Sequence, residues 1–241
     1  MKTFLCIAGL ILVLLPSSAT RASGDDRTTF RGPVRVLEVN LYRGLVRIRA
    51  EAGAKNLSFR RGRVDWDRWT RGTDPWPQRR DLAEELLETE TRGDTVRISA
   101  PTVRDLVALE ITIPAAVELI VHIDHYGDVE VRGARAGIEV EQFQGRITLE
   151  DVSGPLVANI TRDGDIQVRF ADRPAARAMA LTTYEGNIDL EVPAAAAGRL
   201  KITTLEGDIR NDLGRPTTLT SAQSFIRVRN ARGTIHVRPT R

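Results

Sequence analysis

Four short polar residues stand directly after turn glycines in the second half of the chain, and they are the first candidates for chemistry: Asp128, Asp165, Asn187 and Asp208. Stacked side by side, they could bind Ca²⁺ or supply the acidic pair that glycoside hydrolysis uses. Asp and Asn are also ordinary turn residues, Arg146 interrupts the series, and the tandem glycines of calcium-binding repeats are absent. We therefore favour a turn role.

A second cluster is His122-Ile-Asp124-His125. In a strand, His122 and Asp124 point to one face and His125 points to the other, so only two of these side chains share a face. A closed metal site needs more ligands than two. We interpret the cluster as a solvated strand face before a turn, and we predict no metal site and no cofactor.

Three tryptophans within eleven residues are the best candidates for ligand binding. Trp66, Trp69 and Trp76 lie in a segment rich in proline, glycine and arginine, with Arg68 and Arg71 between them. Such a composition predicts a loop. Aromatic rings stack on sugars or on arginines, so this loop is the predicted binding site. The alternative is a hydrophobic lid packed over the β structure.

The patterns of common catalytic centres are absent from the sequence. It has no Gly-x-Ser-x-Gly elbow, no His-Glu-x-x-His motif and no phosphate-binding loop. We therefore predict no catalytic residues and no enzymatic activity.

Arginines alternate near the C-terminus. We expect them to shield a terminal edge strand from pairing with another chain, or to contact an anionic envelope glycan or lipid headgroup. The residues are Arg227, Arg229, Arg232, Arg238 and Arg241.

A repeated phrase predicts the elements that position these residues. It consists of a small turn residue, a polar residue and an apolar–polar–apolar triplet, and it begins at Gly127, Gly145, Gly164, Gly186, Gly207, Ser224 and Gly233. Successive turns are 18, 19, 22, 21, 17 and 9 residues apart. A near-regular period is typical of stacked repeats. We therefore predict an all-β protein, a β-solenoid (right-handed, β-helix-like) with coils of roughly 18–22 residues.

This solenoid would stack four isoleucines in one interior column: Ile147, Ile166, Ile188 and Ile209. An antiparallel β-sandwich is the alternative fold, because two-residue hairpin turns also favour glycine in second place.

The N-terminus has the layout of a secretory signal peptide. Lys2 precedes an unbroken apolar run from Phe4 to Leu15, which is too short to span a membrane, and small residues follow. We expect residues 1–22 to be the signal peptide, with cleavage after Ala22. The only cysteine, Cys6, lies inside this segment, so the mature chain would form no disulfide.

The charge balance excludes nucleic acid as an expected partner. Without Lys2 and Arg21, the 35 basic residues become 33, against 32 acidic residues. In the remaining chain, we expect residues 23–113 to form an N-terminal β region that holds the Trp-rich loop and a short helix over 81–88. Residues 114–241 would form the repeat β-solenoid.

Several motifs resemble a bacterial family of secreted or envelope proteins that are described only as adhesins, related to the head domains of auto-transporter adhesins. The similar segments are Ile111-Thr-Ile-Pro114, Leu119 to Val131, the Thr-Thr-x-x-Gly-x-Ile units at 182–188 and 203–209, and Val39 to Ile48. The resemblance implies a β-solenoid, a secreted, periplasmic or cell-surface location, and no established catalytic residues.

We therefore expect an exported envelope or cell-surface binding protein, non-catalytic, with a glycan or another envelope component as partner. No transmembrane span is expected after signal cleavage. The alternatives are a structural scaffold of the cell envelope and a polysaccharide-degrading enzyme.

Overall fold

The computed structural model describes residues 19–21, 27–62, 87–100, 106–171, 179–193, 200–214 and 226–240. All regular structure in these residues is β-strand, which confirms the all-β prediction. Most of the expected helix over 81–88 lies outside the described residues, and its last residue, Glu88, begins a strand. No helix among the described residues is long and apolar enough to cross a membrane.

Fifteen strands form one hydrogen-bonded sheet. They are β1 (Ala19–Arg21), β2 (Arg27–Phe30), β3 (Val36–Glu51), β4 (Leu57–Arg61), β5 (Glu88–Arg92), β6 (Thr95–Ala100), β7 (Val107–Pro114), β8 (Glu118–Arg132), β9 (Ile138–Val152), β10 (Leu156–Asp163), β11 (Ile166–Phe170), β12 (Met179–Glu185), β13 (Ile188–Val192), β14 (Leu200–Asn211) and β15 (Ile226–Pro239). β1 belongs to the segment that we expect to be cleaved, and cleavage stays a prediction.

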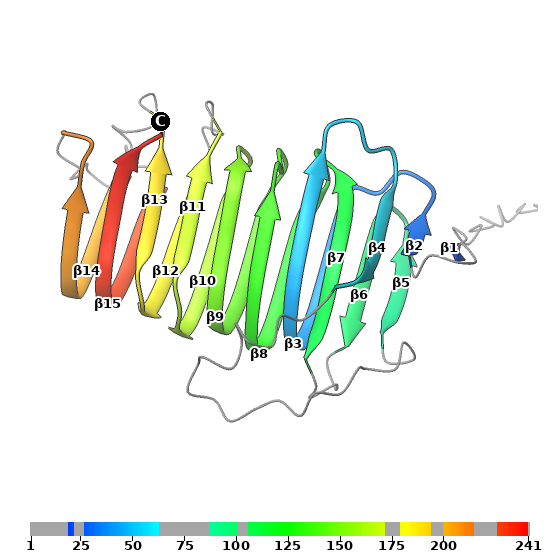
Figure 1. Ribbon diagram of the computed structural model, residues 1–241, viewed down its shortest axis with the longest axis horizontal. Coiled ribbons are helices and arrows are strands. Elements are labelled where there is room, and N and C mark those ends of the chain that lie inside the picture. Colours follow the sequence, from blue (N-terminus) through cyan, green and yellow to red (C-terminus); the bar gives the residue numbers. More distant parts are fainter. Residues whose placement is uncertain are drawn as a thin grey trace, which may run out of the picture.

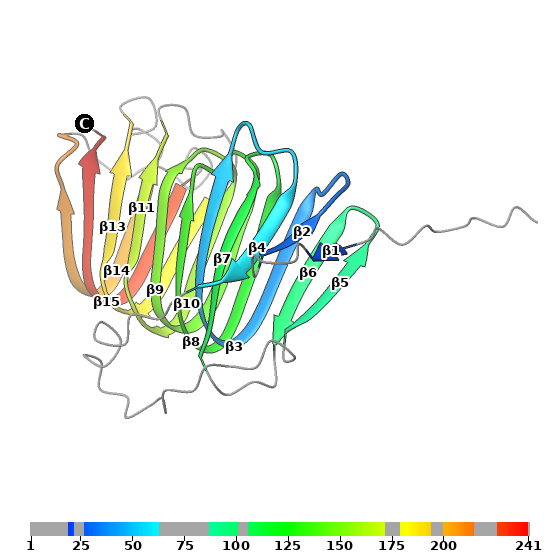
Figure 2. The ribbon, with the colours of Figure 1, turned by 45° about the vertical axis from the view of Figure 1, so that its right-hand side comes forward.

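Each repeat contributes two arms that meet at a bend. In β3, β8, β9, β14 and β15 one long strand runs through both arms, whereas β10–β11 and β12–β13 divide at the bend. Figures 1 and 2 show the arms folding back along the lower edge of the molecule, so that the stack has two layers. Apolar side chains alternate along both arms and fill the space between the layers as one continuous core.

The repeats stack through parallel pairing, with both arms of one repeat in register with both arms of the next. The glycines that begin the repeated phrase therefore lie at bends between parallel-stacked arms, not at the hairpin turns of the alternative sandwich. A two-residue hairpin turn, Gly93-Asp94, joins β5 to β6 at the end of the stack. Because β9 and β15 run through both layers, the parallel pairings of β9, β10, β12, β15, β13 and β11 form a closed ring.

The repeats do not stack in chain order at either end, which differs from a simple solenoid. Along the stack the order is β6–β7, β3, β8, β9, β10–β11, β12–β13, β15, β14. The first two repeats are exchanged, and so are the last two. β15 thus lies between β12–β13 and β14, and β14 is the outermost strand at this end in Figure 1.

Because the last two repeats are exchanged, the isoleucine column differs from the predicted one at its end. Ile147, Ile166 and Ile188 are paired in register and fully buried, as expected. The next position is occupied by Ile235, and Ile209 follows it on β14. Ile209 is 44% exposed because β14 has a neighbour on one side only among the described residues.

Seven glycines form a column along the bend, in the order Gly44, Gly127, Gly145, Gly164, Gly186, Gly233 and Gly207. A Cβ atom on any of the last five would overlap the carbonyl oxygen of a neighbouring glycine. Gly145, Gly186 and Gly233 also have positive φ, which side chains disfavour. The repeated glycine is therefore required by close backbone approach between repeats.

Two buried polar side chains satisfy glycine carbonyls at the bend. The Thr183 hydroxyl donates to the Gly164 carbonyl at 3.0 Å, and the Asn230 amide donates to the Gly186 carbonyl at 3.3 Å. Since an unpaired buried polar group costs free energy, these bonds help the core to tolerate polar residues beside the bend.

Antiparallel strands cover the first end of the stack. β5 pairs with β6, while β4, β2 and β1 extend outward from β7. Leu57, Phe59 and Phe30 anchor this extension in the core, with the two phenylalanine rings 6.0 Å apart. The outward-facing residues of β2 and β4 therefore lie beside those of β7 and β3.

Candidate functional site

The predicted binding residues Trp66, Trp69, Trp76, Arg68 and Arg71 lie within 63–86, outside the described residues. The binding role of this loop stays a prediction, and so does the alternative of a lid.

The polar residues after the glycines accept hydrogen bonds from backbone N–H groups, and the Asn187 amide also donates to the Asp165 carboxylate at 3.4 Å. Asp128 accepts a hydrogen bond from the backbone N–H of Arg146 at 3.0 Å, and Asp165 accepts from that of Asn187 at 2.9 Å. Asn187 in turn accepts from the N–H of Thr234 at 3.0 Å. These bonds join neighbouring repeats, which favours the turn role. Among the residues that the structure describes, no cluster of His, Cys, Asp and Glu could hold a metal ion.

The His122 cluster follows the strand geometry that the sequence predicted. The His122 imidazole lies 2.8 Å from Asp124 and 3.7 Å from Glu141, and all three side chains are about half exposed. These contacts describe a solvated polar face.

His125 faces the other way and joins a row of rings along the bend. Its ring lies 5.5 Å from that of Tyr42 and 6.2 Å from that of Phe143, and the Arg162 guanidinium lies 5.9 Å from the Phe143 ring. Because consecutive repeats supply the rings, the row also links repeats through aromatic and cation–π contacts.

The four predicted arginines that lie on β15, Arg227, Arg229, Arg232 and Arg238, do not shield a terminal edge strand, because β15 has neighbours on both sides. Arg232 binds Glu185 on β12 at 2.6 Å and Glu206 on β14 at 3.1 Å. Hydrogen bonds to Glu185, which has the larger effect, and to Glu206 raise the pKa of Arg232 above its ordinary value. Its side chain links the exchanged strands to their neighbours. Arg241 lies outside the described residues.

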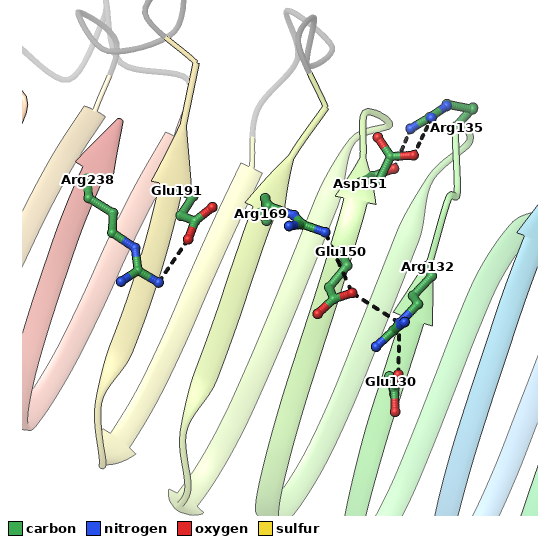
Figure 3. Close-up of polar contacts among 8 residues, drawn as sticks. All are labelled: Glu130, Arg132, Arg135, Glu150, Asp151, Arg169, Glu191 and Arg238. Carbon is green, nitrogen blue, oxygen red and sulfur yellow. Dashed lines mark hydrogen bonds and ion pairs between the residues drawn. The ribbon is translucent and has the colours of Figure 1, made fainter. Parts of the chain in front are cut away.

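Charges alternate in sign across the outer face of the second layer (Figure 3). Arg132, Glu150, Arg169, Glu191 and Arg238 occupy the same register position on successive strands. Glu150 lies 3.0 Å from Arg132 and 3.7 Å from Arg169, and Glu191 lies 2.9 Å from Arg238. Each exposed pair contributes little, but the alternation avoids like charges on facing residues.

A shallow groove opens on the same face, at the end of the stack that the antiparallel strands cover. Its volume is about 390 Å³, and β2, β3, β4, β7 and β8 contribute the lining. The polar lining residues are Arg27, Arg47, Arg49, Ser58, Arg60, Glu110, Thr112, Glu130 and Arg132. Five guanidinium groups thus face two carboxylates, a formal excess of three positive charges.

The two carboxylates of the groove are shared among three of the arginines. Glu110 lies 2.6 Å from Arg60 and 3.9 Å from Arg47. Glu130 lies 2.9 Å from Arg132 and 3.7 Å from Arg47. Within the described ranges of the chain, no ion pair is formed by Arg27 or Arg49.

The chemistry of this lining favours recognition of oxyanions. Guanidinium groups stay protonated at any physiological pH, and their planar donors match carboxylate, sulfate and phosphate. The sequence did not predict the groove because its arginines come from four separate segments and form no motif. The only local signal is Arg47-Ile-Arg49, in which alternation places both cations on one strand face.

No family model matches the chain, and no curated protein matches it. Two solved structures are similar in part. One is described as a "putative cell adhesion protein" from Clostridium sporogenes ATCC 15579, with a TM-score of 0.40, 9% identity, and coverage of 86% of this chain and 94% of the other. The second is described as a "putative adhesin" from Bacteroides fragilis NCTC 9343, with a TM-score of 0.37, 13% identity, and coverage of 88% and 96%. At these scores the two structures carry no weight for the function of this chain.

Proposed function

We propose that this protein is exported and acts by binding, without catalysis, at the cell surface or in the cell envelope. In this proposal the parallel stack is a β-solenoid-like scaffold, and the groove between β2 and β8 receives a negatively charged glycan. The excess of guanidinium over carboxylate groups in the groove carries the proposal.

Two further observations support this function. The N-terminal sequence has the layout of a signal peptide, which predicts export. In addition, the described part of the chain has a continuous buried core that runs through the whole stack. Such a core gives a stiff scaffold, and a stiff scaffold holds the groove residues in place before the ligand arrives.

A panel of immobilised acidic and neutral glycans, read for both retention and cleavage, tests the proposal. We expect saturable retention of acidic glycans without cleavage, and weaker retention as ionic strength rises because exposed charges are screened. Cleavage products would favour a polysaccharide-degrading enzyme. Failure to retain any glycan would contradict the proposal and would favour an envelope scaffold.

A further inference from the structure

We infer that the groove contains a subsite for a single oxyanion, a carboxylate or a sulfate, of an acidic polysaccharide. The subsite consists of Arg49, Arg132 and the hydroxyl groups of Ser58 and Thr112. This inference rests on the proposed function, because it names the ligand group that the groove binds.

The alternation of charges fails at the groove. Beyond the groove, from Arg132 to Arg238, every cation in the series has an acidic residue beside it. On the other side, Arg132 is paired in register with Arg49. Neighbouring strands are about 4.8 Å apart, so two positive side chains face one another on adjacent strands. Like charges in such positions are destabilising, and an anion bound between them would relieve this repulsion.

Arg49 is the cation of this pair that needs a partner. Arg132 already contacts Glu130 and Glu150, at 2.9 Å and 3.0 Å. The position beside Arg49 on its other strand neighbour is Thr112, whose own partner on β4 is Ser58. Arg49 therefore lies between a second cation and two hydroxyl groups, all of which can donate hydrogen bonds to an oxyanion.

A second row of paired residues bounds the subsite. It runs Arg27, Arg60, Glu110, Arg47 and Glu130 across the same four strands, β4, β7, β3 and β8, and extends to β2 through Arg27. The two rows are two residues apart along each strand, about 7 Å. Arg27 and Arg60 form another pair of like charges, so the anionic groups of one extended ligand would meet both positive positions.

The surface around the groove favours an acidic polysaccharide as the ligand over an anionic membrane. Glu130, Glu150 and Glu191 stand on the same outer face as the arginines and would repel an anionic membrane laid against it. A polysaccharide chain can place its acidic groups at the groove while its neutral hydroxyls cross the rest of the face.

Isothermal titration calorimetry of the full mature chain tests the inference. The probes are hexagalacturonate for carboxylates, a heparin hexasaccharide for sulfates, and maltohexaose as the neutral control. Arg49→Gln should weaken acidic-probe binding by about tenfold or more, because a charge-assisted interaction is lost. Arg49→Lys should be intermediate, since charge remains but the planar fork does not. Thr112→Val, which removes only a hydroxyl, should weaken binding by a few-fold.

The matched control is Arg210→Gln, an exposed arginine on β14, at the opposite end of the stack from the groove. It should leave binding within about twofold of the parent, which excludes an effect of net charge alone. Equal binding of acidic probes by parent and Arg49→Gln would overturn the subsite while leaving the proposed function intact. Preferential binding of maltohexaose would overturn the subsite as well. If no probe and no glycan of the panel binds, both proposals fail.

Discussion

Replacement of Gly164 by alanine should destabilise the protein, because the added methyl group would clash with the backbone of the neighbouring repeat. Gly164 has no positive φ, so the added methyl group brings no backbone penalty of its own. Its Cβ would overlap the carbonyl oxygen of Gly145 on the adjacent repeat and would lie 3.0 Å from the Ile160 Cδ1 atom. The carbonyl belongs to the sheet backbone, so relief requires separating two paired repeats.

The expected loss is about 1–3 kcal/mol, as for other groups forced into packed interiors. In a chain of this size each kcal/mol lowers Tm by roughly 2–4 °C. Gly53→Ala is the matched control, because nothing lies within 4 Å of its added Cβ and its φ is ordinary. That variant should be neutral or slightly more stable, through a less flexible unfolded chain.

Thermal and urea unfolding of both variants, followed by circular dichroism, measure the difference. The glycine column would lose its assigned role if Gly164→Ala were as stable as Gly53→Ala. A third variant, Gly186→Ala, adds positive φ to the same steric overlap. It should therefore be less stable than Gly164→Ala.

The fold and the sequence support three other predictions. Ile188→Ala removes a fully buried side chain and should cost about 2–5 kcal/mol in urea unfolding, whereas Ile209→Ala at the exposed end of the column should cost less than about 1 kcal/mol; equal losses would contradict the observed order of the last two repeats. Asn187→Ala removes a side-chain acceptor for the neighbouring repeat and should cost about 1 kcal/mol, and an unchanged urea midpoint would show that the bond contributes nothing. Mass spectrometry of the exported protein should find an N-terminus near Ser23 and no thiol, while retention of Cys6 would refute signal cleavage.

The repeated phrase predicted the register of this fold well. The six phrases that start with glycine begin where the backbone bends, and the apolar residues after each glycine alternate, so Ile147, Ile166 and Ile188 could be aligned from spacing alone. Ser224 lies outside the described residues, and the residues from Ile226 belong to the first arm of β15. The order of the last repeats could not be derived in this way. Gly207 and Gly233 begin the same kind of phrase, and either one could follow Gly186.

Burial shows why β15, and not β14, lies next to β12–β13. The arms of β15 bury Ile226, Val228, Ile235 and Val237, whereas Leu205 on β14 is 72% exposed. β14 is therefore suited to an outer position, and the presence of Glu206, Asp208 and Arg210 around its bend is the signal in the sequence.

The groove could not be predicted from the spacing of residues in the sequence. Arg27 and Arg60 reach it only because β4 pairs antiparallel with β7 and β2 pairs antiparallel with β4. Arg49 meets Arg132 only because β3 is exchanged with β6–β7 in the stack. Pairing between distant segments sets both juxtapositions, whereas the strand pattern predicted only which face each side chain takes.

A crystal structure of the mature protein with hexagalacturonate tests the central claim most directly. We predict one carboxylate within hydrogen-bond distance of the Arg49 guanidinium and of the Ser58 or Thr112 hydroxyl, with Arg132 on its other side. An empty groove at a ligand concentration that saturates binding in solution, or a ligand bound on another surface, would contradict the claim.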